Sequence, residues 1–427
     1  MSALALYTLL LRAAMPLILL RLWWRARREP GYREHVDERF ARYADEAHGE
    51  VIWLHAVSVG EARAASPLVN ALAREFPGRE LLVTCTTAAG RETLTQVFGA
   101  SVTIAYLPYD LPETVRRFLD HFRPRLGVLM ETEVWPNLLA ACHERGLPLM
   151  LANARMSEKS AHGYARWTSL TRPAFASLAA VCAQSAADAE RLRALGAREV
   201  EISGNLKFDV EPDAAQLAAG RAWRAALGAR QVLLFASTRE GEEELLLDAL
   251  PHDAERVVII VPRHPRRFDE VARLVAERGF ALARRSRGEA PAESNALYLG
   301  DTLGEMAFYY AASDVAVIGG SFQPLGGQNL IEACAAGAPV VIGPSTFNFA
   351  EATRLAVASG AAVQMHDAHS ALRVARDLLG DAEQRRHMAQ AGIALCAAHR
   401  GATARHLAAC KRLLQARRSA APDARSY

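Results

Sequence analysis

The sequence predicts an α/β protein with two doubly wound domains, each built around a parallel sheet. Short apolar runs with strand character alternate with helical stretches along the chain, which is typical of parallel strands joined by crossover helices. The alternation breaks near residues 204–213, which contain Pro212, and then starts again. A length of 427 residues also exceeds that of one ordinary domain. We therefore expect two domains in tandem.

The first predicted element is an apolar helix at the N-terminus. The segment 3–24 is long enough to cross the core of a bilayer, although Arg12 and Pro16 interrupt it, and two adjacent tryptophans at its end suit a membrane interface. Basic residues flank this end: Arg21, Arg25, Arg27 and Arg28. We expect residues 1–28 to be a membrane anchor, either a single span or a helix lying in the interface, with the rest of the chain on the cytoplasmic side.

The predicted strands fall into two groups. Those of the first group are 51–57, 81–86, 102–107, 126–131, 147–152 and 181–183, and those of the second are 232–236, 257–261, 296–299, 315–318 and 340–342. The corresponding domains are 29–208 and 209–416, followed by a polar tail, 417–427, that we expect to be disordered. Because ligands of doubly wound sheets bind beyond the carboxyl ends of the strands, two such domains facing each other would form a cleft.

Composition limits the partners and cofactors. A net charge of +3 is too small to indicate nucleic acid as a partner. The six cysteines form no Cys-x-x-Cys pair, and several lie in apolar runs, so we expect reduced core residues of a cytosolic domain rather than disulfides or a zinc site. The sequence contains no His-Glu-x-x-His and no Asp-x-Asp, so the usual carboxylate clamp for a metal-bound diphosphate is missing.

The most informative segment is a glycine-rich loop between a predicted strand and a predicted helix. It reads Gly319-Gly320-Ser-Phe-Gln-Pro-Leu-Gly326-Gly327-Gln-Asn329-Leu-Ile-Glu332. Glycine lets the backbone approach a ligand closely, and N–H groups at a helix start favour an anionic oxygen. A phosphate on these amides, with ribose hydroxyls on Glu332, would be a nucleotide-sugar site. The alternative is a glycine-rich turn without a ligand.

Carboxylates follow two predicted strands of the first domain. Glu61 stands at a predicted helix start, where it can accept the proton of an attacking hydroxyl and where the helix dipole favours its ionised form. Glu131 and Glu133 stand beside Trp135, an arrangement that suits hydroxyl binding with a sugar stacked on the indole. The alternatives are an acid that only stabilises a helix start, and a solvated loop with a packed tryptophan.

Hydroxyl and basic side chains follow two predicted strands of the second domain: Ser237, Thr238, Arg239, Arg263 and His264. Arginine binds both phosphate and carboxylate bidentately, so this group indicates an anionic ligand. Lys207, at the break between the domains, is placed to reach across the cleft. Each basic residue by itself fits a solvated surface charge, but their shared location at strand ends favours binding.

The motifs occur in a characteristic order: 55–61, 131–137, 153–155, 204–207, 236–240, 263–265, 301–305, 319–332 and 343–349. Together they resemble the 3-deoxy-D-manno-octulosonic acid (Kdo) transferases of lipopolysaccharide biosynthesis over nearly the whole chain. The resemblance implies a GT-B fold with two Rossmann-like domains. It also implies transfer of Kdo from CMP-Kdo to a lipid A precursor, lipid IVA, at the inner leaflet of the cell inner membrane, with inversion and without a metal or cofactor.

The resemblance also implies roles for particular residues. Glu61 matches the general base, and Glu131 and Glu133 match an acidic motif of the active site. Basic residues near the CMP phosphate and the Kdo carboxylate, and a nucleotide-binding pair, are matched by Arg239, Arg263 and His264 and by Asn329 and Glu332. The chain departs from the family pattern at Gln328, where many members have histidine followed by Asn-Pro-Leu-Glu, and at Ser345, where many have histidine. Both replacements keep hydrogen-bonding ability.

Two other functions fit parts of this pattern. Another GT-B enzyme, such as a hexosamine transferase or a nucleotide-sugar epimerase, would share the fold, but an epimerase needs no lipid acceptor, so the anchor argues against it. A membrane-attached sugar-binding protein without activity is the second alternative. The presence of Glu61 together with a complete nucleotide loop argues against that function.

Overall fold

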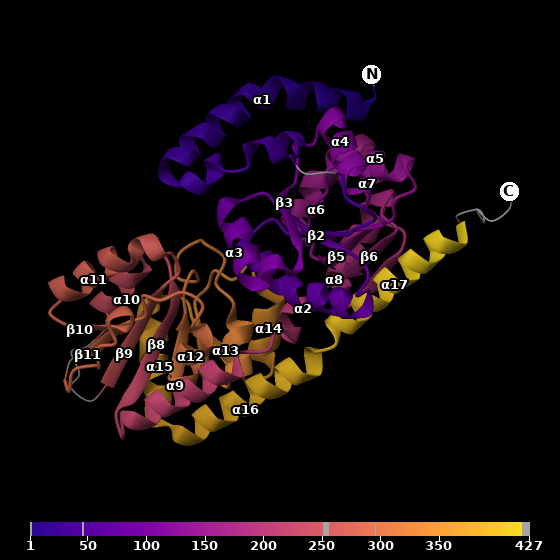
Figure 1. Cartoon of the computed structure of the whole chain (residues 1–427). Helices are drawn as coiled ribbons and strands as arrows, with labels where there is room; N and C mark the ends of the chain where they lie inside the picture. Colours follow the sequence, from indigo (N-terminus) through magenta and orange to yellow (C-terminus); the bar gives the residue numbers. More distant parts are fainter. Residues whose placement is uncertain (1, 45–46, 251–255, 295, 421–427) are drawn as a thin grey trace, which may run out of the picture. The chain divides into compact units, whose positions relative to one another are not determined.

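The computed structural model describes residues 2–44, 47–250, 256–294 and 296–420 (Figure 1). The chain divides into two compact units. The first unit contains the described residues up to Val210 and those from Arg400 on, and the second unit contains Glu211–His399. Each unit has one seven-stranded parallel sheet. The predicted class, with two doubly wound sheets, is therefore confirmed.

The sheet of the first unit has the strand order β3-β2-β1-β4-β5-β6-β7. Its strands are β1 Ile52–His55, β2 Leu81–Cys85, β3 Thr103–Tyr106, β4 Leu126–Met130, β5 Leu149–Ala154, β6 Ala180–Ala183 and β7 Val200–Ile202. Its helices are α1 Ala3–Arg28, α2 Val59–Glu75, α3 Ala88–Phe98, α4 Pro112–Phe122, α5 Pro136–Glu144, α6 Glu158–Ala165, α7 Thr168–Ala176, α8 Ala186–Ala194 and α17 Ala402–Ala420, with short 3-10 turns η1 Pro30–Arg33, η2 Val36–Phe40, η3 Gly99–Ser101 and η4 Leu206–Asp209.

Alternate residues of the segment 51–54, which includes most of the central strand β1, fill two different hydrophobic clusters. Val51 and Trp53 pack in one cluster, and Ile52 and Leu54 pack in the other. All four side chains are at most 2% exposed. Because both faces of this sheet are covered, its central strands are apolar almost throughout, and this continuous pattern is what made them recognisable in the sequence.

The sheet of the second unit has the order β10-β11-β9-β8-β12-β13-β14. Its strands are β8 Gln231–Thr238, β9 Arg256–Pro262, β10 Ala281–Arg284, β11 Ala296–Leu299, β12 Val315–Ile318, β13 Val340–Ile342 and β14 Ala362–Gln364. Its helices are α9 Ala214–Ala226, α10 Glu242–Asp248, α11 Phe268–Glu277, α12 Met306–Ala311, α13 Leu330–Ala336, α14 Ala350–Ala358, α15 Ala368–Gly380 and α16 Ala382–His399, with 3-10 turns η5 Pro265–Arg267 and η6 Arg285–Arg287.

Three strands of the structure were not predicted: β7, β10 and β14. Each is the last strand at an edge of its sheet and has three or four residues. Each also contains half-buried or exposed positions, so it lacks the continuous apolar run that marks the central strands.

The C-terminal helix α17 belongs to the first unit, which corrects the predicted second domain of 209–416. Ala409 and Cys410 are fully buried in the cluster that also contains Ile52. The backbone N–H of Asn153 donates to Nε2 of His406 at 2.9 Å, and Nδ1 of His406 bonds the carbonyl of Ala402. Burial lowers the pKa of His406 to about 4. This helix therefore completes the core of a unit whose other residues lie far earlier in the chain.

The predicted disorder of 417–427 is wrong for its first residues, since α17 continues to Ala420. The Arg417 guanidinium donates to the carbonyls of Pro124 and Arg125, so this end of the helix is fastened to the first unit. The remainder of the predicted tail, 421–427, lies outside the described residues. All six cysteines are free and buried, in agreement with the prediction that they are core residues.

Candidate active site

In the first unit, the loops after β1 and β4 lie where the strand order reverses. β1 pairs with β2 on one side and with β4 on the other. Ligands of doubly wound sheets bind beyond the carboxyl ends of the strands at such a switch point. The two loops carry the predicted residues Glu61, Glu131, Glu133 and Trp135. The fold thus brings four residues from two distant segments to one edge of the sheet.

Glu61 lies in the first turn of α2, as predicted. Ser58 caps this helix, and its hydroxyl donates to Oε1 of Glu61 at 3.3 Å. The backbone N–H of Val57 donates to Oε2 at 2.8 Å. Glu61 therefore stabilises the helix start, which was the structural alternative, while its carboxyl group lies at the switch point.

Glu131 is held by cations and by an unusual backbone conformation. Its φ of 58° is in the left-handed region, which directs the chain sharply out of β4. Oε1 of Glu131 lies 3.0 Å from Nζ of Lys207, and Oε2 lies 4.0 Å from a guanidinium nitrogen of Arg155. Lys207 is placed by η4, whose first turn is capped by the side chain of Asn205.

The three carboxyl groups of these loops have different pKa values. Burial, and then the charges of Glu131 and Glu133, raise the pKa of Glu61 to about 8. Burial also raises the pKa of Glu133 to about 7, with a smaller contribution from Glu131 against the opposing effect of Trp135. Burial alone would raise the pKa of Glu131, but Lys207 and Arg155 outweigh it and hold that pKa below its ordinary value. Carboxyl groups with separated pKa values are typical of acid–base sites.

Trp135 is half-buried at the start of α5, and its ring packs against the hydrophobic cluster on one face of the sheet. This contact agrees with the packed tryptophan of the structural alternative. Sugar stacking on the indole remains a prediction.

In the second unit, the loops after β8 and β12 lie at the equivalent switch point, because β8 pairs with both β9 and β12. Ser237 and Thr238 are the last two residues of β8, Arg239 follows them, and the glycine-rich loop follows β12. Arg263 and His264 follow the neighbouring strand β9, and the N–H of Arg263 bonds the carbonyl of Thr238. The predicted residues of the second domain therefore also gather at one edge of one sheet.

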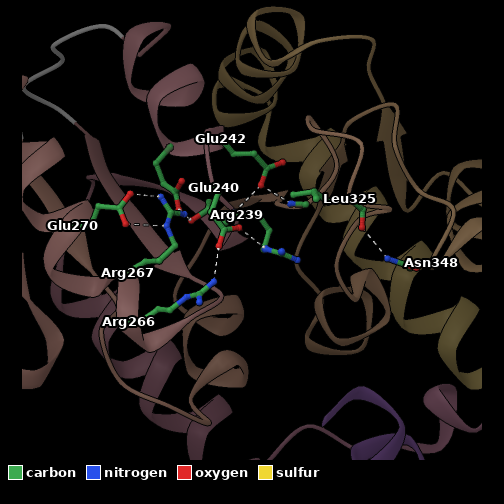
Figure 2. A network of polar contacts seen from close by, with 11 residues as sticks. Arg239, Glu240, Glu242, Arg266, Arg267, Glu270, Leu325 and Asn348 are labelled. Atoms are coloured by element: carbon green, nitrogen blue, oxygen red, sulfur yellow. Dashed lines mark hydrogen bonds and ion pairs between the residues drawn. The ribbon is translucent and has the colours of Figure 1, made fainter. Parts of the chain in front are cut away.

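The polar side chains at this edge form a network of ion pairs and hydrogen bonds. Figure 2 shows Glu240 between Arg239 and Arg266, with nitrogen–oxygen distances of 3.1 and 3.4 Å. The Thr238 hydroxyl donates to Glu243, so its first role is structural. Ser237 has a φ of 57°, which bends the chain at the end of β8. Burial, followed by the charges of Arg239 and Arg263, lowers the pKa of His264, as expected in a positive environment.

The glycine-rich loop needs its glycines for two reasons. A Cβ on Gly319 would lie 2.6 Å from the carbonyl oxygen of Ser237, so only glycine permits the two loops to approach this closely. Gly320, Gly326 and Gly327 have φ values of 67°, 85° and 74°, a region that favours glycine. At the end of the loop, the Asn329 side chain caps the N–H of Ile331 and donates to Glu332 at 3.0 Å. The predicted pair Asn329 and Glu332 is therefore in direct contact.

Comparisons with known proteins identify the family. Residues 34–210 match the protein family described as 3-Deoxy-D-manno-octulosonic-acid transferase (kdotransferase). A 3-deoxy-D-manno-octulosonic acid transferase from Bordetella pertussis is 48% identical over 94% of this chain and 97% of its own length. A protein of the same name from Haemophilus influenzae is 35% identical over 96% of this chain and 98% of its own.

The chain belongs to the Kdo transferase family. Solved structures of similar fold include Anabaena Alr3699/HepE in complex with UDP, which has a TM-score of 0.58 at 14% identity and covers 86% of this chain and 99% of its own. A putative UDP-N-acetylglucosamine 2-epimerase from Listeria monocytogenes has a TM-score of 0.55 at 16% identity and covers 85% of this chain and 96% of its own. At these identities the likeness concerns the fold alone, and it agrees with the predicted GT-B class.

Ser345, at a position where the resemblance implies histidine in many members, has a specific contact. Its hydroxyl accepts the N–H of Gly326 at 3.0 Å, and the N–H of Ser345 donates to the carbonyl of Ser321. Nearby, the side chain of Asn348 donates to the carbonyl of Leu325 at 2.9 Å (Figure 2). The second departure, Gln328, donates its backbone N–H to the carbonyl of Gly319. The Ser345 side chain therefore connects the glycine-rich loop to the loop after β13, whereas the bond of Gln328 is made by its backbone and does not depend on its side chain.

Several residues that support the two strand-end edges were not predicted from the sequence: Asn153, Glu242, Glu243 and His406. Three of them contact partners far along the chain, as in the 78-residue separation of Glu242 and Gly320, and Glu243 contacts Thr238 and Arg267. The motif 153–155 was noted, but the positive φ of Asn153, 52°, and its hydrogen bond to the N–H of Leu206 have no local signal. Among the described residues, no group of three or more His, Cys, Asp or Glu is arranged to hold a metal ion.

Proposed function

We propose that the protein transfers Kdo from CMP-Kdo to a lipid A precursor, lipid IVA, with inversion at the anomeric carbon and without a metal. Membership of the Kdo transferase family supports the class of sugar transferred. The observation that carries the mechanism is the placement of Glu61 and Glu131 after the two strands of one switch point, with Glu131 paired to Lys207. Burial and the charge of Glu131 there raise the pKa of Glu61 to about 8.

In the proposed reaction, a hydroxyl of the acceptor attacks the anomeric carbon of Kdo and transfers its proton to Glu61. The new carbon–oxygen bond forms as the bond from that carbon to the phosphate oxygen breaks, and CMP leaves with the electron pair. A carboxylate with a raised pKa is a stronger base than an ordinary one, which suits this role. Glu131 keeps its charge because of Lys207 and therefore does not compete for the proton.

The donor is proposed to bind at the switch point of the second unit. Arg239, Arg263 and His264 would bind the CMP phosphate and the Kdo carboxylate, because arginine pairs with both anions. Asn329 and Glu332 would hold the ribose hydroxyls, and the glycine-rich loop would let the nucleotide approach the backbone. Lys207 is also proposed to bind the donor. Its ion pair with Glu131 supports a different role, which is to hold that carboxylate in its charged form.

The N-terminal helix is proposed to attach the protein to the inner leaflet of the cell inner membrane. Within the described residues, α1 is the one helix long and apolar enough to cross a membrane, and most of its apolar stretch is exposed. Exposed large side chains cover its surface: Leu6, Leu9, Leu10, Leu17, Leu19, Leu20, Trp23 and Trp24. An apolar helix exposed in this way is suited to contact lipid.

The contacts of α1 favour a helix that lies in the membrane interface over one that spans the bilayer. Near its start, the Tyr7 hydroxyl donates to Asp110 and the Thr8 hydroxyl donates to Asn137, both at 3.0 Å. Near its end, the Arg25 guanidinium lies 4.4 Å from the ring centroid of Tyr32. A straight 26-residue helix is about 39 Å long, so a span would carry Tyr7 to the opposite side of the membrane and break the first contacts.

One incubation separates the proposal from its alternatives. The purified protein is mixed with CMP-Kdo, the tetraacyl lipid A disaccharide and a metal chelator, and the lipid is analysed by mass spectrometry. We expect the mass of the lipid to increase by at least one Kdo unit. Activity that requires added magnesium would contradict metal independence. An epimerase would instead convert a nucleotide sugar without lipid, and an inactive sugar-binding protein would leave both substrates unchanged.

A further inference from the structure

Glu242 is a buried carboxyl group with no part in the reaction described above. It is 0% exposed and stands at the first position of α10, immediately after Gly241. Gly241 has a φ of 82°, and this left-handed turn directs the chain from β8 into the short helix. The backbone is therefore arranged to bring the Glu242 side chain back over the end of β8. A buried carboxylate is costly unless it is hydrogen-bonded, so its partners are informative.

The partners of Glu242 are backbone N–H groups from two different loops. Oε2 accepts the N–H of Arg239 at 2.9 Å and the N–H of Gly320 at 2.5 Å. Oε1 accepts the N–H of Phe322 at 2.9 Å. Figure 2 shows the labelled Glu242 carboxyl group with hydrogen bonds drawn to neighbouring backbone. One side chain thus connects the loop after β8 to the glycine-rich loop after β12.

These two loops are the ones that flank the switch point of the second unit. Arg239, a proposed anion ligand, has its backbone fixed directly by Glu242. In the other loop, a Cβ added to Gly319 would lie only 2.6 Å from the carbonyl oxygen of Ser237 at the end of β8. The two segments therefore approach each other too closely for a larger residue at this position. Glu242 also engages the N–H of Gly320, one of the amides that the sequence suggested for phosphate. A nucleotide would then be bound by the other groups of this edge.

We propose that Glu242 is a positioning residue for the nucleotide-sugar donor, which holds the Arg239 loop and the glycine-rich loop in register before the donor binds. This inference rests on the proposed donor site. Hydrogen bonds to an ionised acceptor are stronger than those between neutral groups, so one carboxylate can fix three amides of two loops. Replacement by glutamine keeps the size of the side chain but turns one acceptor into an N–H donor that faces an N–H group.

A matched control exists at the opposite end of the same strands. Oδ2 of Asp314 accepts the N–H of Val232 at 2.8 Å and a guanidinium N–H of Arg224 at 3.0 Å. Asp314 precedes β12 and Val232 lies near the start of β8, so this carboxylate also connects β8 to β12, but at their amino ends. Asp314→Asn should lower stability without reaching the proposed donor site.

The test uses the full chain and separates donor binding from general stability. For Glu242→Gln we expect the KM for CMP-Kdo and the Kd for CMP to rise about tenfold or more, with the KM for the lipid acceptor unchanged. For Asp314→Asn we expect a lower melting temperature with both donor constants unchanged. A Glu242→Gln protein that is folded and has donor constants within about twofold of wild type would overturn the proposal, as would an equal rise in Asp314→Asn.

A second measurement on the unmodified protein does not depend on the folding of a variant. Hydrogen–deuterium exchange of peptides covering 319–325 reports whether the Gly320 and Phe322 amides are already bonded. We expect slow exchange of these amides without nucleotide and little change when CMP is added. Rapid exchange that becomes slow only with CMP would overturn the proposal. A wild-type protein that binds no CMP would instead count against the proposed donor site, while the exchange of the free protein would still report on Glu242.

Discussion

The Nζ atom of Lys207 lies 3.0 Å from the Oε1 atom of Glu131, and this ion pair joins loops that are 76 residues apart in the sequence. Glu131 follows β4, and Lys207 lies in η4 after β7. The pair holds the pKa of Glu131 below its ordinary value, although burial alone would raise it. The persistent charge of Glu131 then adds to the effect of burial in raising the pKa of Glu61. Lys207 therefore acts indirectly on the proposed base.

The rate of transfer is expected to rise with pH up to about 8. A carboxyl group with a pKa of about 8 is mostly protonated at neutral pH, and only its ionised form accepts a proton. Below that pKa, kcat/KM should increase about tenfold per pH unit. Glu131→Gln removes one cause of the raised pKa and should move this limb of the profile to lower pH. Asp120→Asn, an exposed partner of Arg145, is the control and should not move it. A limb that stays in place in Glu131→Gln would show that another group titrates.

The same raised pKa predicts a pH-dependent effect on stability. The folded state binds the Glu61 proton more tightly than the unfolded state, whose carboxyl pKa is near the ordinary value of about 4.5. This contribution to stability is fully present below pH 4.5 and is lost as the pH rises toward about 8. The glutamine of Glu61→Gln does not ionise, so the variant does not lose this contribution. The free energy of unfolding of the variant minus that of wild type should therefore become more positive as the pH rises from 5 to 8. Urea unfolding at several pH values measures this, and a difference independent of pH would contradict the raised pKa.

The orientation of α1 can be tested by labelling Ser2→Cys with a thiol reagent that does not cross membranes. The six native cysteines are buried, so they give little background in the folded protein. If α1 lies in the interface, Ser2→Cys should react only when the cytoplasmic face is accessible, like the control Glu158→Cys on the exposed start of α6. Reaction of Ser2→Cys, but not of Glu158→Cys, in intact spheroplasts would indicate a helix that spans the bilayer.

Removal of α17 is expected to unfold the first unit. A chain ending at His399 loses Ala409 and Cys410 from the hydrophobic core and leaves the N–H of Asn153 without His406. Deletion of several fully buried residues costs more than the stability of a typical domain can absorb. A chain ending at Ala420 is the control, since it keeps the whole helix. If each unit unfolds in its own transition, circular dichroism and calorimetry should show the transition of the first unit lost in the shorter chain only. Retention of both would contradict the role of α17.

The sequence was sufficient for the central strands because both faces of each sheet are covered. Residues such as Val51, Ile52, Trp53 and Leu54 must all be apolar, which leaves a continuous signal. Edge strands such as β14 and the helix α17 have no comparable signal. The assignment of α17 to the first unit depends on contacts such as that between Asn153 and His406, 253 residues apart, which no local pattern contains.

The candidate site was predictable where it depends on strand ends. Glu61 and Glu131 follow the two strands of one switch point, and Arg239 and Gly319 follow the two strands of the other, so a strand prediction already places them at the edges of their sheets. The groups that hold these residues were not predictable. Glu242 resembles an ordinary acid at a helix start until the structure shows the amides that it accepts.

The role of Glu61 as the base is best tested with Glu61→Gln, and Asp188→Asn is the matched control. Asp188 has the same local setting in the first unit, with a capping serine, Ser185, and an accepted backbone N–H from Met156 at 2.7 Å, but it follows β6 rather than a strand of the switch point. Both replacements change an acidic residue beside a capping serine in the first turn of a helix, so the comparison isolates the chemical role of Glu61.

The decisive measurement is single-turnover transfer of Kdo by the two variants, with CMP affinity measured by calorimetry on the same samples. We expect a rate for Glu61→Gln that is lower by about 10²–10⁴-fold, with the Kd for CMP nearly unchanged, because the proposed CMP contacts lie in the second unit. Asp188→Asn should keep nearly the full rate. A Glu61→Gln protein with a rate close to that of Asp188→Asn would show that Glu61 is not the base and would transfer that role to Glu131 or Glu133.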